Sequence, residues 1–336
     1  MSGPLAVLGL LAVAWGTFAG AASLAVTLAW RLRVDWLRGL HPSLRSRLAW
    51  LAAATPSLLP VALVLACVSP GLAGLLAGTG DHCLQHADHP HLCLIHFPAT
   101  LRGPLVAAGC LTAVALAIRL TRATLDLSRR RRGLALLGAT ATTETGPMRR
   151  VVPSDQPFSF VAGLLQPKIW VASALEDSLP TEQLAVVLAH ERAHADRRDP
   201  LRTATAAALS WPLWPSVRRA ILRELALASE QACDEAAARG LGDEPGNRLR
   251  VAETILAVER LAARTPAAFV PSSASAFGGS NVRERVHGLV GDLGAERLPR
   301  WLSRAAIAGV AVGLPAGADA LHHGVEHWIR LLLHLA

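Results

Sequence analysis

The sequence contains no tyrosine, a single lysine (Lys168) and few charged residues of any kind. Only 17% of its 336 residues are charged, whereas 52% are hydrophobic, and the mean hydropathy is +0.36. This balance argues against an ordinary soluble globular protein and indicates segments that lie in a membrane. Arginine supplies nearly all of the positive charge behind the net +8, and a GC-rich coding bias explains it. We therefore expect no direct binding to nucleic acid.

Three apolar runs are long enough to cross a bilayer, for which about 20 residues suffice. They cover residues 4–30, 48–76 and 104–120. A fourth run, 305–318, is shorter and contains Pro315, so it crosses only if the chain that follows it contributes. The first run lacks a basic segment before it and is followed by arginines, which favours an uncleaved anchor over a signal peptide. We expect an α-helical polytopic membrane protein with about four transmembrane helices.

The arginines predict how the chain is oriented. Loop 31–47 carries five arginines and the block Arg129–Arg132 follows the third run, whereas loop 77–103 has only Arg102. Because positive flanks stay in the cytoplasm, the N-terminus and loop 77–103 should lie outside the inner membrane. The chain then divides into three parts: a membrane domain over 1–120, a cytosolic domain over 121–300, and a fourth transmembrane helix with an amphipathic tail over 301–336.

The cytosolic part combines short strand-like pieces with longer helical ones. The β-type pieces follow a small polar linker at 138–147 and are separated by proline and glycine, which indicates a small antiparallel sheet or a set of hairpins. They are residues 149–152, 158–161 and 168–171. Helical periodicity predicts four helices, at 182–197, 217–239, 247–263 and 282–290. The domain is therefore expected to be α+β and mostly helical.

His190, Glu191 and His194 form the pattern His-Glu-x-x-His inside the first of these helices. Residues four apart lie on one face of a helix, so both imidazoles can bind the same zinc ion while the glutamate stands beside a zinc-bound water. The pattern predicts a zincin-like metallopeptidase in which the glutamate acts as general base. The alternative is three unrelated polar side chains on one helix, and the acidic cluster that follows makes it less favoured.

A catalytic zinc keeps three protein ligands and one open position, so a third ligand has to come from another element. The best candidate is Glu230, because Asp234 lies four residues on and shares its helix face. Asp234 can then accept a hydrogen bond from the far nitrogen of a ligating histidine. By spacing alone, Glu224 and Glu235 remain alternatives. Asp199, just after the histidine helix, is also well placed to brace the site.

Three stretches resemble the membrane-embedded zinc metallopeptidases typified by the beta-lactam sensor-transducers of the BlaR/MecR type. They are "AHERAHADRRDPL", "ASEQACDEA" and, before the histidine helix, "FSFVAGLLQPKIWV". The resemblance covers roughly residues 120–290 and the layout of the spans. It implies three zinc ligands, His190, His194 and Glu230. It also implies that Glu191 is the general base and that Asp234 contacts a zinc ligand without binding the zinc itself.

The resemblance further implies how a substrate binds and in what setting. The strand formed by Lys168, Ile169, Trp170 and Val171 would be an edge onto which an extended protein substrate adds by backbone hydrogen bonds. The setting would be signalling, in which an outer or intramembrane stimulus leads to cleavage of a cytosolic transcriptional repressor. The chain ends at Ala336, shortly after the fourth apolar run, so we expect no penicillin-binding sensor domain and no beta-lactam sensing.

Two other interpretations stay open. A membrane quality-control or prenyl-protein protease of the Ste24/HtpX kind would share both His-Glu-x-x-His and Glu-x-x-x-Asp, although "QPKIWV" and "EQACDE" favour the first family. A non-proteolytic metal-binding membrane sensor or scaffold would keep the zinc fold for structure alone. The intact Glu191 argues against a scaffold.

The outer loop 77–103 is rich in histidine and cysteine. Its stretch "DHCLQHADHPHLCLIH" contains Cys83 and Cys93 together with five histidines: His82, His86, His89, His91 and His96. Imidazole and thiolate ligands suit a transition metal such as copper or zinc. An oxidising outer compartment would equally allow a disulfide between the two cysteines, with incidental histidines. Both interpretations stay open, and a role of the loop in sensing is a hypothesis.

Overall fold

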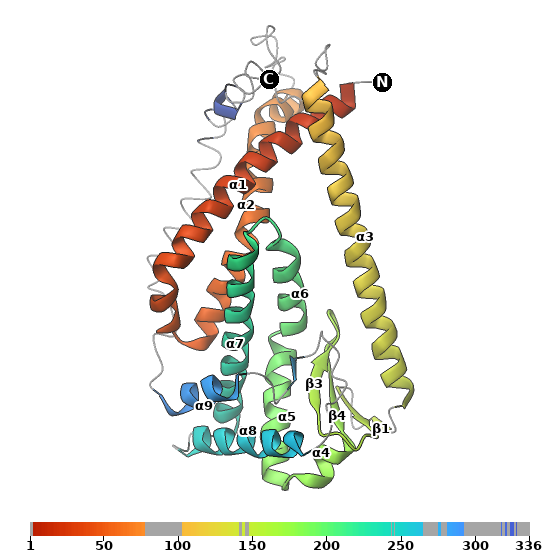
Figure 1. Cartoon of the computed structure of the whole chain (residues 1–336), viewed down its shortest axis with the longest axis vertical. Helices are drawn as coiled ribbons and strands as arrows, with labels where there is room; N and C mark the ends of the chain where they lie inside the picture. Colours follow the sequence, from red (N-terminus) through yellow and green to blue (C-terminus); the bar gives the residue numbers. More distant parts are fainter. Residues whose placement is uncertain are drawn as a thin grey trace.

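The computed structural model shows long helices above a smaller unit of helices and strands (Figure 1). It describes residues 3–77, 103–140, 143–144, 148–242, 244, 246–264, 275–276 and 281–291, together with residues 317, 320, 323–325 and 327. The fourth apolar run, residue 317 excepted, lies outside the described residues, and so do the cysteines and histidines of the predicted outer loop.

Two antiparallel helices carry the most apolar part of the described chain. α1 (Gly3–Arg38) and α2 (Pro42–Ala77) are joined by a short turn. They contain the stretches Leu8–Arg38 and Pro42–Ser69, which are long and apolar enough to cross a membrane. Among the described residues these are the two helices that meet this description. The predicted third and fourth spans stay predictions.

α3 (Gly103–Thr140) is longer than the predicted span at 104–120. It continues without a break past Arg129–Arg132, and its last turns take up the beginning of the predicted linker at 138–147. Figure 1 shows it running from the end where α1 begins down to the sheet. The helix therefore joins the apolar end of the molecule to the sheet in one piece.

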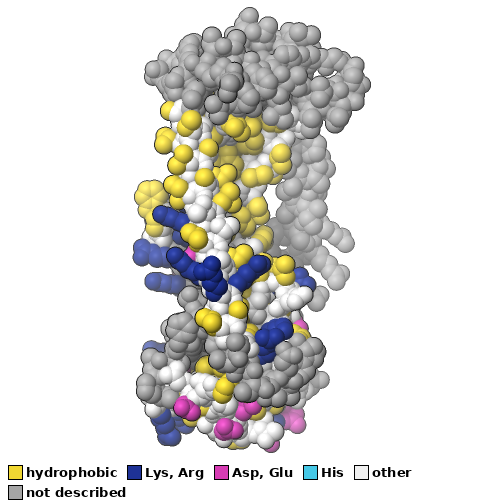
Figure 2. All heavy atoms as spheres, turned by 90° about the vertical axis from the view of Figure 1, so that its right-hand side faces the viewer, with side chains coloured by type: hydrophobic (Ala, Val, Ile, Leu, Met, Phe, Trp, Pro, Cys, Tyr) yellow, Lys and Arg dark blue, Asp and Glu magenta, His cyan; other side chains and the backbone are white. Residues whose placement is uncertain are grey.

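The surface changes character along the length of the molecule. Figure 2 shows hydrophobic side chains over the upper half and the side chains of arginine and lysine gathered below them, above the lower unit. Exposed apolar side chains on α1 and α2 include Leu24, Leu28, Leu58 and Leu65. An apolar surface of this extent, bordered by basic residues, is typical of a region that lies in a bilayer and ends at the lipid headgroups.

A mixed sheet forms one wall of the lower unit, with strand order β1-β2-β4-β3-β5. The strands are β1 (Thr143–Glu144), β2 (Arg149–Val152), β3 (Ser159–Ala162), β4 (Lys168–Ala172) and β5 (Ser275–Ala276). β4 pairs antiparallel with β3 through a tight turn and, on its other side, in parallel with β2. The predicted antiparallel pairing is present between β3 and β4, whereas the parallel pairing of β2 with β4, which is not local, was not predicted.

β4 lies inside the sheet. Its two sides are occupied by β2 and β3 along its length. The prediction that Lys168, Ile169, Trp170 and Val171 offer a free edge to a substrate is therefore wrong. The outer side of β3 pairs instead with the two residues of β5, Phe160 with Ala276 and Val161 with Ser275.

Several helices pack with the sheet around one apolar core: α4 (Ser173–Ser178), α5 (Thr181–Asp196), α8 (Asn247–Ala263), α9 (Val282–Val290) and the end of α7 (Pro215–Gly240). Large buried members are Phe160, Trp170 and Leu175, and the Phe160 and Trp170 rings stack with centroids 6.2 Å apart. Burying each such side chain stabilises the fold by about 1.5–3 kcal/mol. α5 reaches this core through Val186 and Val187, which positions the histidines of its next turns.

α6 (Asp199–Leu209) and α7 (Pro215–Gly240) form a hairpin that leaves the lower unit and reaches between the long helices (Figure 1). A second core joins them to α2; its buried members are Ala49, Ala53, Ala206, Leu213, Val217, Ile221 and Leu225. α6 was not predicted, whereas α5, α7, α8 and α9 begin and end within two residues of their predicted bounds. The lower unit and the long helices thus share a core.

Gly163 occupies the turn between β3 and β4 with φ +114°, a value that residues with a side chain rarely adopt. A Cβ atom there would lie 2.3 Å from the carbonyl oxygen of Gln166. We expect Gly163→Ala to lower the free energy of unfolding by about 2–3 kcal/mol, measured by denaturant unfolding in detergent. Gly246→Ala is the control, because Gly246 has φ −77° and open space around it. Equal losses in both variants would contradict the prediction.

Candidate metal centre

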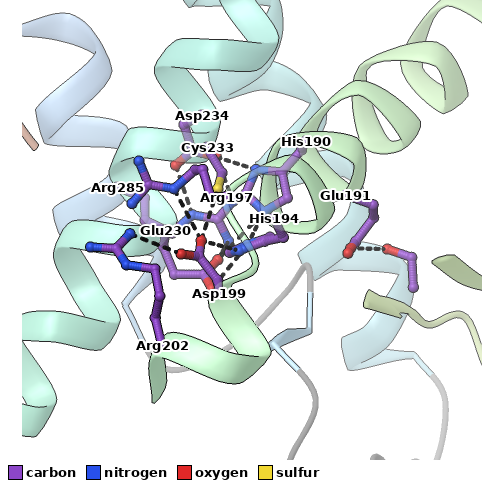
Figure 3. A network of polar contacts seen from close by, with 11 residues as sticks. His190, Glu191, His194, Arg197, Asp199, Arg202, Glu230, Cys233, Asp234 and Arg285 are labelled. Atoms are coloured by element: carbon purple, nitrogen blue, oxygen red, sulfur yellow. Dashed lines mark hydrogen bonds and ion pairs between the residues drawn. The ribbon is translucent and has the colours of Figure 1, made fainter. Parts of the chain in front are cut away.

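Two buried histidines on α5 face a glutamate on α7 (Figure 3). His190 and His194 lie one turn apart, and their Nε2 atoms are 3.1 Å apart. Glu230 brings its carboxylate to both rings, with Oε2 3.6 Å from Nε2 of His190 and Oε1 3.5 Å from Nε2 of His194. The structure therefore brings together the three residues that the sequence predicts as ligands.

Each histidine has a second carboxylate at its other ring nitrogen. Oδ1 of Asp234 lies 2.9 Å from Nδ1 of His190, and Oδ2 of Asp199 lies 2.9 Å from Nδ1 of His194. Because a carboxylate accepts hydrogen bonds, it favours a proton on Nδ1 and leaves a lone pair on Nε2. Two imidazole nitrogens and a carboxylate thus direct electron pairs at one buried point. They repel one another unless a cation lies among them.

The spacing of these atoms suits a tetrahedral metal ion. Zinc binds histidine nitrogen and carboxylate oxygen at about 2.1 Å, which puts the ligand atoms of a tetrahedral site about 3.4 Å apart. In this structure the two Nε2 atoms are 3.1 Å apart, and each has one Glu230 oxygen nearby, Oε2 at 3.6 Å from His190 and Oε1 at 3.5 Å from His194. The residues therefore fit a metal with three protein ligands, and the two outer carboxylates hold the imidazoles in the orientation that binding needs.

Asp199 reaches His194 because of the turn between α5 and α6. α5 ends at Asp196, and Arg198 adopts the left-handed conformation with φ 53° and ψ 41°. Asp199 then begins α6, followed by Pro200, whose fixed φ suits the first turn of a helix. The reversal turns the carboxylate back onto the histidine that lies five residues earlier.

Two arginines hold Asp199 in place. Arg197 Nε and Arg202 Nη1 each donate to its carboxylate at 3.1 Å. Both guanidinium groups also donate to Oγ of Ser46 in the first turns of α2, at 2.9 and 3.5 Å. Burial raises the pKa of Asp199, but His194 and the two arginines together bring it below its ordinary value. Asp199 is therefore ionised at neutral pH.

Arg285 of α9 performs the same task for Asp234. Its Nε and Nη2 donate to the two carboxylate oxygens at 2.9 and 2.6 Å, and Nη1 lies 3.4 Å from Oε2 of Glu230. Burial raises the pKa of Asp234, but Arg285 and His190 together bring it below its ordinary value. A bidentate pair of this kind fixes the orientation of the carboxylate. Sequence reasoning missed Arg285, because a single arginine in a short helix forms no recognisable pattern.

Glu191 lies beside the cluster, on the side of the sheet (Figure 3). It is fully buried, and its Oε1 accepts a hydrogen bond of 2.8 Å from Oγ of Ser159 in β3. Its Oε2 has no hydrogen-bond partner among the described residues. Burial raises the pKa of Glu191, and the two histidines oppose that rise. Ser159 was also missed, although it lies within the stretch "FSFVAGLLQPKIWV".

The two alternative ligands on α7 point elsewhere. Glu224 pairs with Arg45 at 3.0 Å, and Glu235 pairs with Arg248 at 2.6 Å. At 3.6 residues per turn, they lie about 120° and 140° around the helix from Glu230. Helix geometry therefore selects Glu230 from the three.

The protein already favours a positive charge between the imidazoles. Burial opposes a charge on His194, but Cys233 and the nearby carboxylates hold its pKa well above the ordinary value. Burial likewise opposes ionisation of Glu230, but the histidines and Arg285 hold its pKa well below the ordinary value. The site therefore stabilises a cation at its centre, and a proton or a metal ion can supply it.

Helices long and apolar enough to cross a membrane accompany a buried cluster of histidines and carboxylates, an arrangement that suits a membrane-associated metallopeptidase. The sequence pattern described as BlaR1 peptidase M56 matches residues 106–289, which is more than half of the chain, and the chain belongs to this family. No curated protein matches the chain. Family membership confirms the predicted resemblance and implies a metal ion, typically zinc.

The second carboxylates can be tested through metal affinity. We expect Asp199→Asn to weaken metal binding about 10–100-fold, because the neutral amide holds the Nδ1 proton of His194 less strongly. Competition with a chromogenic chelator measures this change. Asp196→Asn is the matched control, since Asp196 is exposed at the end of α5, the helix that carries His194. A comparable loss in the control would show a general charge effect and contradict the assignment.

Proposed function

We propose that the chain is a membrane-embedded zinc endopeptidase that hydrolyses peptide bonds of a cytosolic protein. The observation that carries this proposal is the convergence of His190, His194 and Glu230 on one buried point, with a carboxylate behind each imidazole. Two nitrogens and one oxygen suit zinc, whereas magnesium and calcium take oxygen ligands. Membership of the M56 family supports the same metal.

In this proposal His190, His194 and Glu230 would hold the metal. Bound zinc supplies Lewis acidity, which polarises a peptide carbonyl and makes water acidic enough to attack it near neutral pH. Glu191 accepts the proton of the attacking water at Oε2 and passes it to the leaving amine. Ser159 holds Oε1 and so orients the carboxylate. The raised pKa of Glu191 suits a group that has to hold a proton briefly.

The proposed substrate site is the edge of β3. Ser159 begins β3 and binds Glu191, so a peptide paired with this strand would run past the base. An extended substrate would take the place of Ser275–Ala276 and pair with Phe160 and Val161. Backbone hydrogen bonds to β3 would supply affinity, and pockets for alternate side chains would supply selectivity.

The proposed setting is regulated signalling at the inner membrane. The N-terminus would lie outside and the peptidase unit in the cytosol, with a transcriptional repressor as substrate. Family membership supports this setting, and the basic side chains at the lower end of the apolar surface in Figure 2 support the orientation.

Two rivals from the sequence make different predictions. A quality-control protease of the Ste24/HtpX kind would cut misfolded membrane proteins, and the family match over residues 106–289 weighs against it. A non-proteolytic sensor or scaffold would need the metal and not the base. Glu191 is fully buried, and its Oε2 has no hydrogen-bond partner among the described residues, which lowers the stability of the fold. A residue that destabilises the fold in this way favours catalysis over a scaffold.

The decisive test separates metal binding from catalysis. We expect Glu191→Gln to keep the zinc content of the wild type and to lower cleavage of casein or of a candidate repressor by at least about 100-fold, because the amide cannot accept a proton. Zinc is measured on the purified full-length chain in detergent, and cleavage by gel and mass spectrometry.

Glu182→Gln serves as the control, because Glu182 is exposed in the first turn of the same helix. It should leave both zinc content and cleavage unchanged. Full zinc content without cleavage in the wild type, across substrates and lipids, would favour the scaffold. Cleavage retained in Glu191→Gln would remove Glu191 from the mechanism.

A further inference from the structure

The hairpin of α6 and α7 ends in a tip that lies among the long helices (Figure 1). The tip is residues 209–214, Leu-Ser-Trp-Pro-Leu-Trp, and the stretch 203–217 around it contains no charged residue. Such a composition favours an apolar or interfacial surrounding over water. The tip belongs in sequence to the peptidase unit, so its position needs an explanation.

The tip meets α1 far inside its apolar stretch. The Trp211 ring stacks on the Trp15 ring, with centroids 5.1 Å apart and planes 18° apart. Trp15 precedes Arg31 by about 24 Å of helix at 1.5 Å per residue. Arg31 is the first of the arginines that mark the headgroup level on α1. Although α1 is tilted in Figure 1, Trp15 and the ring stacked on it lie within the hydrocarbon layer, which is about 30 Å thick.

Serines from both spans bind carbonyl groups of the tip. Oγ of Ser23 in α1 donates to the carbonyl of Pro212 at 3.0 Å, and Oγ of Ser57 in α2 donates to the carbonyl of Leu209. Water would satisfy such carbonyl groups on a solvated turn. In hydrocarbon an unpaired carbonyl is costly, so a turn can enter this layer only where protein groups pair with it. These serines meet that condition.

The two arginines near the tip are also partnered. Arg218 folds back and donates to Oγ of Ser210 and to the carbonyl of Ala207, at 3.1 and 2.9 Å. The Arg119 guanidinium of α3 lies over the Trp211 ring, 4.1 Å from its centroid. An arginine at the depth of Trp211 needs partners of this kind, because its charge is costly to bury alone in the hydrocarbon layer.

Trp214 is the part of the tip that faces outward. Its side chain is 72% exposed, whereas the neighbouring Leu213 is buried in the core shared with α2. An exposed indole on a tip that packs against α2 through Leu213 adds to the exposed apolar side chains of the spans.

We propose that the tip is a re-entrant membrane element. It enters the hydrocarbon layer from the peptidase side, is held between the spans by Ser23 and Ser57, and presents Trp214 to lipid acyl chains. The partner of this surface is the bilayer itself. The two helices that bring Asp199 and Glu230 to the histidines are therefore anchored in the same layer as α1 and α2. The proposal depends on the spans and on no property of the metal.

Depth-dependent quenching tests the proposal. Trp214→Cys is labelled with the fluorophore NBD in the full-length chain, reconstituted in phosphatidylcholine vesicles, and the signal of identically labelled wild type is subtracted to remove the native cysteines. We expect lipids with a mid-chain spin label to quench this fluorophore about twice as strongly as lipids with a headgroup spin label. Dithionite should reduce it slowly.

Leu249→Cys on α8 is the control, because Leu249 is exposed and apolar but lies in the lower unit. In molecules whose lower unit lies on the outside of the vesicle, dithionite should reduce its label rapidly. Lipids with mid-chain spin labels should not quench it. Stronger quenching at position 214 by the headgroup label would place the tip at the interface and overturn insertion. Behaviour like that of position 249 would overturn it as well.

The serine contacts allow a second test that needs no label. We expect Ser57→Ala to lower the unfolding temperature by about 2–4 °C, because the carbonyl of Leu209 loses its partner. Ser69→Ala is matched to it, since Ser69 also lies in α2 but donates to the carbonyl of Ala66 one turn earlier in the same helix. Equal shifts in the two variants, measured by thermal unfolding in vesicles, would mean that the tip does not depend on this hydroxyl.

Discussion

One electrostatic constraint underlies the structure: three electron-pair donors, two of them fully buried and the third largely so, are held close together. The imidazoles of α5 cannot turn away from each other, because Asp234 and Asp199 hold their far nitrogens. Those carboxylates are fixed in turn by Arg285 on one side and by Arg197 with Arg202 on the other. Carboxylates lie behind the imidazoles and arginines lie behind the carboxylates, so that each group keeps the one nearer the centre oriented.

Local spacing was enough to predict much of the peptidase unit. The pattern of His190 and His194 needs only helical periodicity, and the bounds of α8 and α9 follow from their apolar faces. The sheet was different, because whether β4 is an edge depends on β2, which pairs with it across a turn and another strand. The residues of β2 and β4 do not indicate that these two strands pair. Because β2 and β3 cover both sides of β4, the proposed substrate edge is β3.

Sequence reasoning missed the elements and residues that belong to no distinct pattern of hydrophobic periodicity. α6 is short and rich in alanine and threonine, and it starts directly after the turn at Arg198, so its pattern does not distinguish it from the end of the preceding helix. Arg285 is one basic residue among several in α9. By contrast, helix geometry separates Glu230 from Glu224 and Glu235, and Asp234 four residues on marks the correct face.

The contact of Ser46 with Arg197 and Arg202 determines how far the chain can be shortened. A fragment that began after α3 would keep every residue of the metal cluster. It would nevertheless lose the hydroxyl that both arginines share, and it would bare the face of Ala206 and Leu213 that α2 covers. The peptidase unit therefore has no self-sufficient boundary on that side, and reconstitution of its chemistry requires the first two helices to accompany it.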